Sequence, residues 1–220
     1  MIKFPDLSIT EVYKKHAQYF TDCANWVLSS QNKQFVIDDY NRDVIRFLLY
    51  YFNGNRACEG VFPQKGYKLG KQIVLYGTPG VGKTVIMESF SVYLKNMHSP
   101  VAFENVSLMQ MMNYFHINDN IDRYTFNAGK DSLDGKPFNI CMNDIGVSSK
   151  KHFGIDPKEI VEEFLMSRDD IFVQMGRRTY LTTNLDKEDI KDMFYDEYGR
   201  LIDRMLKTYN FIPLLGESRR

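Results

Sequence analysis

The chain has 220 residues, which at roughly 150 residues per domain predicts one compact core with a short extension and excludes a large multidomain protein. Lysine and arginine together number 28, and so do aspartate and glutamate, so the net charge is zero and a uniformly basic nucleic-acid-binding protein is excluded. Apolar residues make up 44% and aromatic residues 14% of the sequence, which is enough for a buried core and too much for a disordered chain.

The N-terminal part of the sequence predicts two helices. Residues 8–30 carry an irregular apolar stripe at helical spacing, with Ser8 placed to cap the first turn. The polar stretch SSQNK follows, so we expect residues 1–34 to form a short helical extension and residues 35–220 the main domain. An amphipathic helix usually packs on its own core, although gripping a partner and self-association are alternatives. A second helix is predicted over 41–52 and ends at FNGN.

From residue 72 onward, short apolar segments alternate with helical patterns. Five strands are predicted, each rich in β-branched or aromatic residues: 72–76, 101–106, 138–142, 179–183 and 210–214. Helices are predicted over 83–97, 108–115, 157–175, after Asp186, and over 198–208. Ser107 with Gln110, and Asp156 with Glu159, have the spacing of a capping box. This alternation indicates an α/β fold with a mainly parallel sheet, whose ligands bind beyond the carboxyl ends of the strands.

The sequence GTPGVGKT matches the phosphate-binding pattern GxxxxGK[ST] between a predicted strand and a predicted helix. Its glycines let consecutive N–H groups and the helix N-terminus face a polyphosphate. Lys83 would reach the β- and γ-phosphates, and the Thr84 hydroxyl would bind Mg²⁺. The alternative, an ordinary glycine-rich turn, explains neither residue. The predicted nucleotide-binding residues are Gly77, Thr78, Pro79, Gly80, Val81, Gly82, Lys83, Thr84 and Val85.

The segment FNICMNDIG predicts a Walker B-like strand about 60 residues after the phosphate loop. In that arrangement one acidic side chain holds the hydrated metal and the next polarises water. Here Asn143, a neutral ligand, takes the first place and Asp144 the second, so the predicted metal ligands are Thr84, Asn143 and Asp144. The alternative is a strand capped by an Asx turn. If the functional interpretation holds, metal affinity is weakened and hydrolysis is slow.

Two further segments offer candidate catalytic residues. The strand YLTTNL ends in Thr183 and Asn184, which could reach a γ-phosphate or the attacking water, or could simply end a strand before the Asp186 cap. In YGRLIDRM, Arg200 and Arg204 lie one helical turn apart. One of these arginines could act as an arginine finger on a neighbouring subunit's nucleotide; read in isolation, solvated arginines paired with nearby acids are the simpler interpretation.

These motifs, in this order and with the terminal GESRR, resemble the AAA+ ATPases of the DnaC-like replicative helicase loader and IstB-type transposition helper branch. The resemblance covers about residues 35–220. It implies a P-loop NTPase fold with a five-stranded parallel sheet in the order 5-1-4-3-2, flanked by helices and without a C-terminal lid domain. The LTTN strand would then lie between the two Walker strands.

The resemblance also assigns roles to individual residues. Asn184 becomes sensor 1, beside Asp144 as a catalytic residue. Arg204 becomes the preferred arginine finger and Arg200 the second choice. Arg219 or Arg220 corresponds to the nucleotide-binding arginine near the end of chains in this branch. The segment 35–41 resembles the linker that packs against adenine.

The implied function is that of an ATPase used as a switch. ATP and Mg²⁺ would close a homo-oligomer that holds single-stranded DNA or a replicative helicase during DNA replication, and hydrolysis to ADP and phosphate would release it. An IstB-like helper with a transposase partner, a nucleotide-binding scaffold with little or no turnover, and a small-molecule kinase are the alternatives. Asn143 puts brisk turnover in doubt, because the branch usually has an acid there, while ATP binding is unaffected.

The remaining sequence features predict location. Cys23, Cys58 and Cys141 form no CxxC pair, so neither a zinc cluster nor a disulfide framework is indicated. The start of the sequence lacks an apolar signal segment, and the longest apolar run, 47–52, is far shorter than the roughly 20 residues that span a bilayer. We therefore expect a cytoplasmic protein with no membrane partner.

Overall fold

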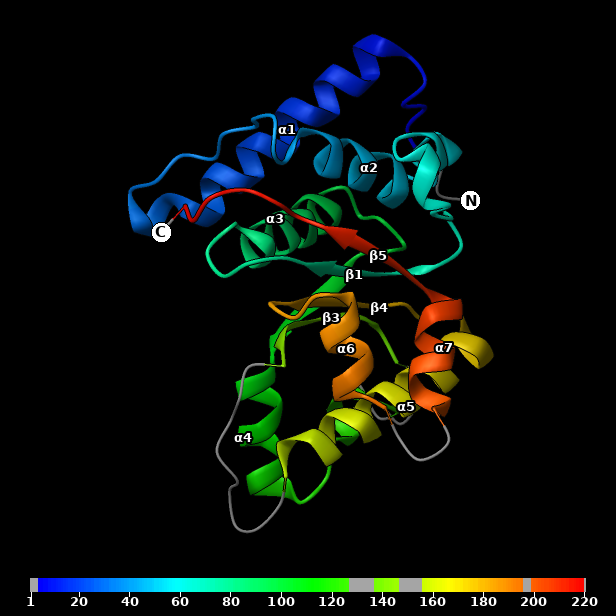
Figure 1. Ribbon diagram of the computed structural model, residues 1–220. Helices are drawn as coiled ribbons and strands as arrows, with labels where there is room; N and C mark the ends of the chain where they lie inside the picture. Colours follow the sequence, from blue (N-terminus) through cyan, green and yellow to red (C-terminus); the bar gives the residue numbers. More distant parts are fainter. Residues whose placement is uncertain (1–3, 127–136, 147–155, 196–198, 220) are drawn as a thin grey trace. The chain divides into compact units, whose positions relative to one another are not determined.

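The computed structural model describes residues 4–126, 137–146, 156–195 and 199–219. Contacts within the chain divide it into two compact units. The first, called here the phosphate-loop unit, comprises the described residues of Met1–Lys71, Gly77–Phe103 and Ile212–Arg220. The second, called the sheet unit, comprises the described residues of Gln72–Tyr76 and Glu104–Phe211. Figure 1 traces the elements of both units in chain order. The predicted division at residues 34 and 35 stays a prediction.

A five-stranded, all-parallel sheet confirms the predicted α/β fold class. Its strands are β1 (Gln72–Tyr76), β2 (Phe103–Ser107), β3 (Asn139–Ile145), β4 (Thr179–Thr183) and β5 (Tyr209–Pro213). Their order, β2-β3-β4-β1-β5, is the predicted 5-1-4-3-2 order read from the other edge. Strand β4 lies between β1 and β3, as Figure 1 shows. Thr183 pairs with Tyr76 on one side and Ile145 on the other, so these three strands end at the same level.

The helices of the sheet unit begin where polar side chains can satisfy free backbone N–H groups. They are α4 (Leu108–Asn118), α5 (Pro157–Met175), α6 (Lys187–Met193) and α7 (Arg200–Thr208), with a short 3-10 helix η4 at Asp122–Tyr124. The predicted Ser107–Gln110 capping box is present, and Asp186 caps α6. Asp156 caps α5 by accepting a hydrogen bond from the N–H of Lys158, whereas the N–H of Glu159 bonds to the Asp156 backbone carbonyl. The predicted capping box of Asp156 with Glu159 is therefore wrong. Helix α4 contacts β3, and α5 contacts β4 and α7.

A buried arginine fastens α5 to the starting ends of two strands. The guanidinium of Arg168 donates to the Thr179 hydroxyl at 2.8 Å and to the Phe138 and Arg178 carbonyls at 2.9 and 3.2 Å. Burial lowers its pKa to about 10, so the group is still protonated at neutral pH. Burying a charge without hydrogen bonds costs free energy, so Arg168 has to stay within reach of these three acceptors. This requirement fixes the position of α5 on β3 and β4.

The phosphate-loop unit is built from three helices. They are α1 (Thr10–Leu28), α2 (Arg42–Phe52) and α3 (Lys83–Asn96), joined by the 3-10 helices η1 (Ser29–Gln31), η2 (Arg56–Gly60) and η3 (Pro63–Lys65). Helix α1 packs on α3 and contacts α2, and its buried Phe20 ring lies 4.3 Å from the ring of Phe90. The ring of Phe90 in turn lies 5.0 Å from that of Phe52, so one aromatic cluster joins all three helices.

Polar groups add a second connection between α1 and α3. The Tyr93 hydroxyl lies 2.6 Å from Nδ1 of His16 and accepts a hydrogen bond from Nδ2 of Asn53 at 3.0 Å. Burial lowers the pKa of His16 and raises that of Tyr93 to about 12. Trp26 of α1 stays largely exposed at the rim of a hollow of about 400 Å³ between α1 and α3.

Helix boundaries differ slightly from the predicted ones, and one predicted cap is wrong. Helix α1 begins at Thr10, with Ile9 in the N-cap position and no side-chain cap. The N–H and hydroxyl of Ser8 instead bond to the carboxylate of Asp6, which closes a local turn before the helix. In the part of the chain that the structure describes, no helix has the length and apolar character needed to cross a membrane.

Candidate nucleotide site

The phosphate loop, residues 77–82, connects β1 to α3. Gly77, Gly80 and Gly82 have φ values of 154°, 88° and 99°, a region that disfavours side chains. Lys83 is 4% exposed, and its ammonium donates to the carbonyls of Gly77 and Thr78 at 2.8 and 2.9 Å. The loop therefore curves around a positive charge at the N-terminus of a 14-residue helix, which is the environment that attracts an anion.

The C-terminal segment of the chain, residues 214–219, lies directly on this loop. A Cβ atom on Gly77 would come within 2.1 Å of the Leu214 carbonyl oxygen, and one on Gly80 within 2.3 Å of the Ser218 hydroxyl. The N–H of Arg219 donates to the Gly80 carbonyl at 2.9 Å. Gly77 and Gly80 are therefore required by close approach of the tail as well as by their backbone angles. Arg220 lies outside the described residues.

The segment predicted to resemble an adenine-binding linker belongs to the same unit. The N–H of Phe35 donates to the side chain of Asn25 at 2.8 Å, and its ring lies 5.7 Å from the ring of Phe20. Tyr40 is 57% exposed, and its side chain lies against Gly216 of the tail. An exposed aromatic ring is thus available beside the tail; its contact with adenine stays a prediction.

In the sheet unit, strand β3 carries a bulge at the predicted Walker B pair. Met142 pairs with Leu181 and Ile145 with Thr183, so β3 has one extra residue over this stretch. Asp144 takes a left-handed conformation with φ 62°, and its N–H donates to the Thr182 hydroxyl at 3.0 Å. The bulge leaves the Asp144 side chain half-buried. A strained, partly exposed carboxylate at a strand end is consistent with a functional role.

Asn143 points the other way, into the sheet unit, and is 3% exposed. Its carbonyl oxygen accepts from the Thr182 hydroxyl at 3.1 Å, and its amide donates to Oδ1 of Asn105 at 3.3 Å. Asn143 therefore joins β2, β3 and β4 through a buried polar network that uses both ends of its amide. Its role as a metal ligand stays a prediction.

The end of β4 presents the predicted Thr183 and Asn184. The Thr183 hydroxyl donates to the Ile145 carbonyl of β3, while Asn184 is exposed immediately after the strand. Asn184 and Asp144 thus leave neighbouring strands at the same edge of the sheet, which is where ligands of parallel sheets bind. A Cβ on Gly146 would lie 2.4 Å from Cδ1 of Leu185, so this edge is tightly packed.

The two candidate finger residues lie on α7. Arg204 forms ion pairs with Asp169 at 3.4 Å and Asp170 at 3.2 Å, both on α5. Asp203, the acid next to Arg204 in the sequence, pairs with Lys207. Burial raises the pKa of Asp169, and the charge of Arg204 opposes this rise. Arg200 is exposed at the first residue of α7.

The described residues were compared with the ligand preferences of metal ions. They contain no group of three or more His, Cys, Asp or Glu side chains suited to a metal ion. Mg²⁺ usually keeps several waters and binds through one or two protein oxygens plus substrate phosphates, so the Thr84 hydroxyl and the Asp144 carboxylate are each chemically suitable ligands. Their joint binding of Mg²⁺ stays a prediction. Three polar residues beside the predicted site residues have no motif in the sequence that would mark them. Asn105 and Thr182 bond to Asn143, and Asp38 bonds to Arg219.

Comparison with known proteins supports this fold. Neither protein-family models nor curated proteins match the chain. A candidate primosome component from Streptococcus pyogenes serotype M3 superposes with a TM-score of 0.54 at 16% identity, over 84% of this chain and 85% of that one. The DnaC helicase loader superposes with a TM-score of 0.51 at 16% identity, over 84% of this chain and 95% of that one.

The chain therefore shares its fold with the candidate primosome component and with the DnaC helicase loader. AMPPCP-bound DnaA from Aquifex aeolicus also matches, with a TM-score of 0.49 at 17% identity, over 84% of this chain and 50% of that one. In this structure GTPGVGKT follows β1, and Asn143-Asp144 lie near the end of β3. The predicted roles of both segments in nucleotide binding stay predictions.

Proposed function

We propose that this protein is an ATP-dependent assembly factor of DNA replication, an AAA+ ATPase that works as a switch. The observation that carries the proposal is the phosphate loop, in which glycines with positive φ curve around the Lys83 ammonium at the start of α3. Such a loop matches a polyphosphate in shape, charge and hydrogen-bonding groups. The AAA+ fold and the helicase-loader and primosome neighbours support placing this activity in replication.

Each candidate residue has a proposed task. On nucleotide binding, the Lys83 ammonium exchanges its two loop carbonyls for phosphate oxygens, and the loop N–H groups bind the rest of the chain of phosphates. Thr84 and Asp144 hold Mg²⁺, directly or through its waters. Asn184 orients the attacking water. Bound ATP would supply the phosphoanhydride bond, and Mg²⁺ would neutralise negative charge on the phosphates.

Slow hydrolysis is part of the proposal, and the Asn143 network supports it. A carboxylate at that position would attract the hydrated metal ion, whereas the Asn143 amide is neutral and already hydrogen-bonded on both sides. The same network favours the second candidate function, a nucleotide-binding scaffold with little or no turnover. Phosphate release in the presence of Mg²⁺ distinguishes these two functions.

The proposed partners are further copies of the chain and a replicative helicase, with an IstB-like transposase partner as the alternative. In the assembly, Arg204 would leave Asp169 and Asp170 and act on the nucleotide of a neighbouring copy, with Arg200 as the second choice. The interior of a cell, and specifically the cytoplasm, is the expected location for such partners.

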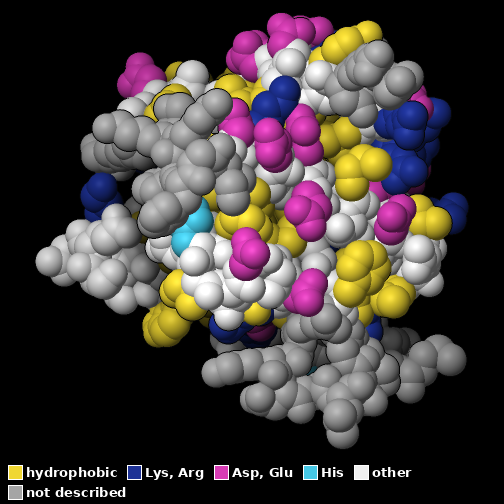
Figure 2. Space-filling model, turned by 90° about the horizontal axis from the view of Figure 1, so that it is seen from below, with side chains coloured by type: hydrophobic (Ala, Val, Ile, Leu, Met, Phe, Trp, Pro, Cys, Tyr) yellow, Lys and Arg dark blue, Asp and Glu magenta, His cyan; other side chains and the backbone are white. Residues whose placement is uncertain are grey.

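Single-stranded DNA is proposed only as a local or assembly-dependent ligand. Figure 2 shows one face of the molecule, where acidic side chains lie scattered among apolar ones and Lys and Arg side chains gather towards the edges. Among the described side chains on that face, none form the broad basic strip that follows a nucleic-acid backbone. The net charge of the whole chain is zero, which also argues against a strongly basic surface for nucleic acid.

Nucleotide binding by a Lys83→Ala variant tests the proposal. We expect ATP affinity, measured by titration calorimetry, to fall by roughly a hundredfold or more, because charge-assisted hydrogen bonds of this kind are worth roughly 1.5–3 kcal/mol each. Lys95→Ala is the matched control, since Lys95 lies in the last turn of the same helix, and it should bind like the wild type. Circular dichroism should show the fold of both variants unchanged. ATP affinity that survives Lys83→Ala would rule out the proposed site.

A further inference from the structure

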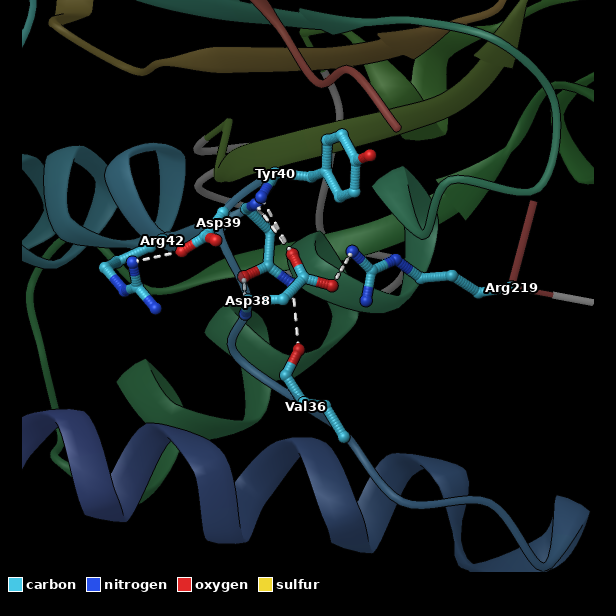
Figure 3. A network of polar contacts seen from close by, with 7 residues as sticks. Val36, Asp38, Asp39, Tyr40, Arg42 and Arg219 are labelled. Atoms are coloured by element: carbon cyan, nitrogen blue, oxygen red, sulfur yellow. Dashed lines mark hydrogen bonds and ion pairs between the residues drawn. The ribbon is translucent and has the colours of Figure 1, made fainter. Parts of the chain in front are cut away.

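An ion pair joins the first and the last stretch of chain in the phosphate-loop unit. Nη2 of Arg219, on the C-terminal tail, donates to Oδ2 of Asp38 at 2.7 Å across a separation of 181 residues. Figure 3 shows the two side chains facing each other. About a third of each side chain is exposed, so the pair is partly shielded from solvent. Pairs of this kind are worth more than fully exposed ones.

The Asp38 carboxylate is held in a fixed orientation by its own turn. Oδ1 accepts hydrogen bonds from the N–H groups of Tyr40 and Asn41 at 3.0 and 3.2 Å. The N–H of Asp38 donates to Oδ1 of Asn41, whose amide donates to the Val36 carbonyl at 2.9 Å. One carboxylate oxygen is therefore used by the turn, and the other is left to face Arg219. Burial by itself would raise the pKa of Asp38, but Arg219 and the two N–H groups outweigh it and keep that pKa below its usual value.

The backbone and side-chain stem of Arg219 lie along the phosphate loop. Its N–H bonds to the Gly80 carbonyl, and its Cδ atom lies 3.8 Å from the position that a Cβ would take on Gly82. Its own carbonyl accepts from Nζ of Lys33 at 3.4 Å. The arginine is thus anchored to the loop at its backbone and to Asp38 at its guanidinium. These two contacts hold the Arg219 guanidinium beside the phosphate loop, whose backbone and charge suit an anion.

We propose that Asp38 is a positioning residue of the nucleotide site: it holds the Arg219 guanidinium beside the phosphate loop, ready to contact the phosphate end of a bound nucleoside triphosphate. The inference rests on the proposed nucleotide-binding function. A fixed guanidinium binds an anion more tightly than a free one, because less side-chain freedom is lost on binding. Without Asp38 the arginine would be free to turn into solvent.

The neighbouring residue provides a matched control. Asp39 pairs with Arg42 at the start of α2, and 89% of its side chain is exposed. Figure 3 shows this pair facing away from Arg219. Asp38→Asn and Asp39→Asn therefore remove the same charge from adjacent positions, and only the first contacts the arginine on the loop.

Titration of the full-length protein with ATP and with ADP tests the inference. We expect Asp38→Asn to weaken ATP binding by about fivefold to tenfold, and ADP binding by less. This is smaller than the effect of losing a whole charge-assisted contact, because Arg219 is still present and only its positioning is lost. Asp39→Asn should leave both affinities unchanged. In an Arg219→Ala background, Asp38→Asn should cause no further loss, because Asp38 acts through Arg219.

Three results would overturn the inference while leaving the proposed function intact. The Asp38→Asn variant could bind ATP as tightly as the wild type, or more tightly. Asp38→Asn could also weaken ATP binding as much in the Arg219→Ala variant as it does in the wild type. Tighter binding would mean that Asp38 competes with phosphate for the arginine. Failure of the wild type to bind ATP would instead remove the proposed function, and the inference with it. Hydrogen exchange of the Arg219 N–H without nucleotide gives a second measurement, since Asp38→Asn should expose that group and an unchanged rate would also contradict the inference.

Discussion

At the scale of single residues, Asn143 decides how the predicted Walker B segment is understood. In the sequence it is a neutral substitute for a metal-binding acid. In the structure its amide completes a buried network with Asn105 and Thr182, and the bulge turns Asp144 out of the strand's regular alternation. Of the two side chains, the Asp144 carboxylate is therefore the partly exposed one, and the Asn143 amide is part of the core.

Replacing Asn143 with aspartate should lower the stability of the fold and raise the rate of ATP hydrolysis. The amide donor to Asn105 is lost and a charge is buried, so we expect the free energy of unfolding in urea to fall by roughly 1–3 kcal/mol. Phosphate release should rise, because a second carboxylate near Asp144 attracts the metal ion. Asn113→Asp, at an exposed position on α4, should change neither quantity. An unaltered rate in Asn143→Asp would mean that Asn143 does not limit hydrolysis.

At the scale of elements, α1 depends on a contact that is sensitive to pH. His16 of α1 meets the Tyr93 hydroxyl of α3, and burial lowers the pKa of that histidine. The unfolded chain then takes up a proton near pH 6.5 while the folded chain resists it, so the unfolded state binds more protons below that pH. The contribution of His16 to stability is complete above this pH and decreases as the pH falls through it.

We therefore expect the unfolding midpoint in urea to fall between pH 7 and pH 5, and His16→Gln to reduce this dependence. Tyr93→Phe should lower the midpoint at both pH values, because Asn53 and His16 then lose their shared partner. Since the pKa of Tyr93 is about 12, its own ionisation does not enter this range. A midpoint whose pH dependence is the same with and without His16 would disagree with this account.

Elements with a strong local signal could be predicted from the sequence, and contacts between distant segments could not. The capping boxes at Ser107 and Asp186 follow from side chains next to the helix they cap. Ser8 misled the prediction because Asp6, two residues away, offered its hydroxyl a nearer acceptor. The sheet order came from the family resemblance, since alternation alone fixes only the class.

In the candidate site, too, the local motif could be predicted from the sequence and the contacts between distant residues could not. GTPGVGKT could be recognised because its function depends on spacing within eight residues. The pairing of Asp38 with Arg219 spans most of the chain, and the bulge at Asn143 depends on how β3 meets β4. Neither has a local pattern, so both required the structure.

At the scale of the whole molecule, self-assembly should depend on Arg204. In the chain described here this arginine is occupied by Asp169 and Asp170, and an ATP-bound assembly would have to draw it away. Arg204→Ala should abolish ATP-dependent self-association in light scattering while leaving ATP affinity unchanged. Lys207→Ala, on the same helix and paired with Asp203, is the control and should assemble normally. Assembly of Arg204→Ala at wild-type concentrations would exclude this residue as the finger.

The phosphate-loop unit draws on three separate stretches of the chain, including its first helices and residues 212–219. During synthesis, α1 and α2 emerge early, yet Asp38 must wait for Arg219 to leave the ribosome some 181 residues later. The phosphate-loop unit is therefore completed only after the intervening strands have been translated. The ion pair between Asp38 and Arg219 is therefore absent from a growing chain until residue 219 has been synthesised.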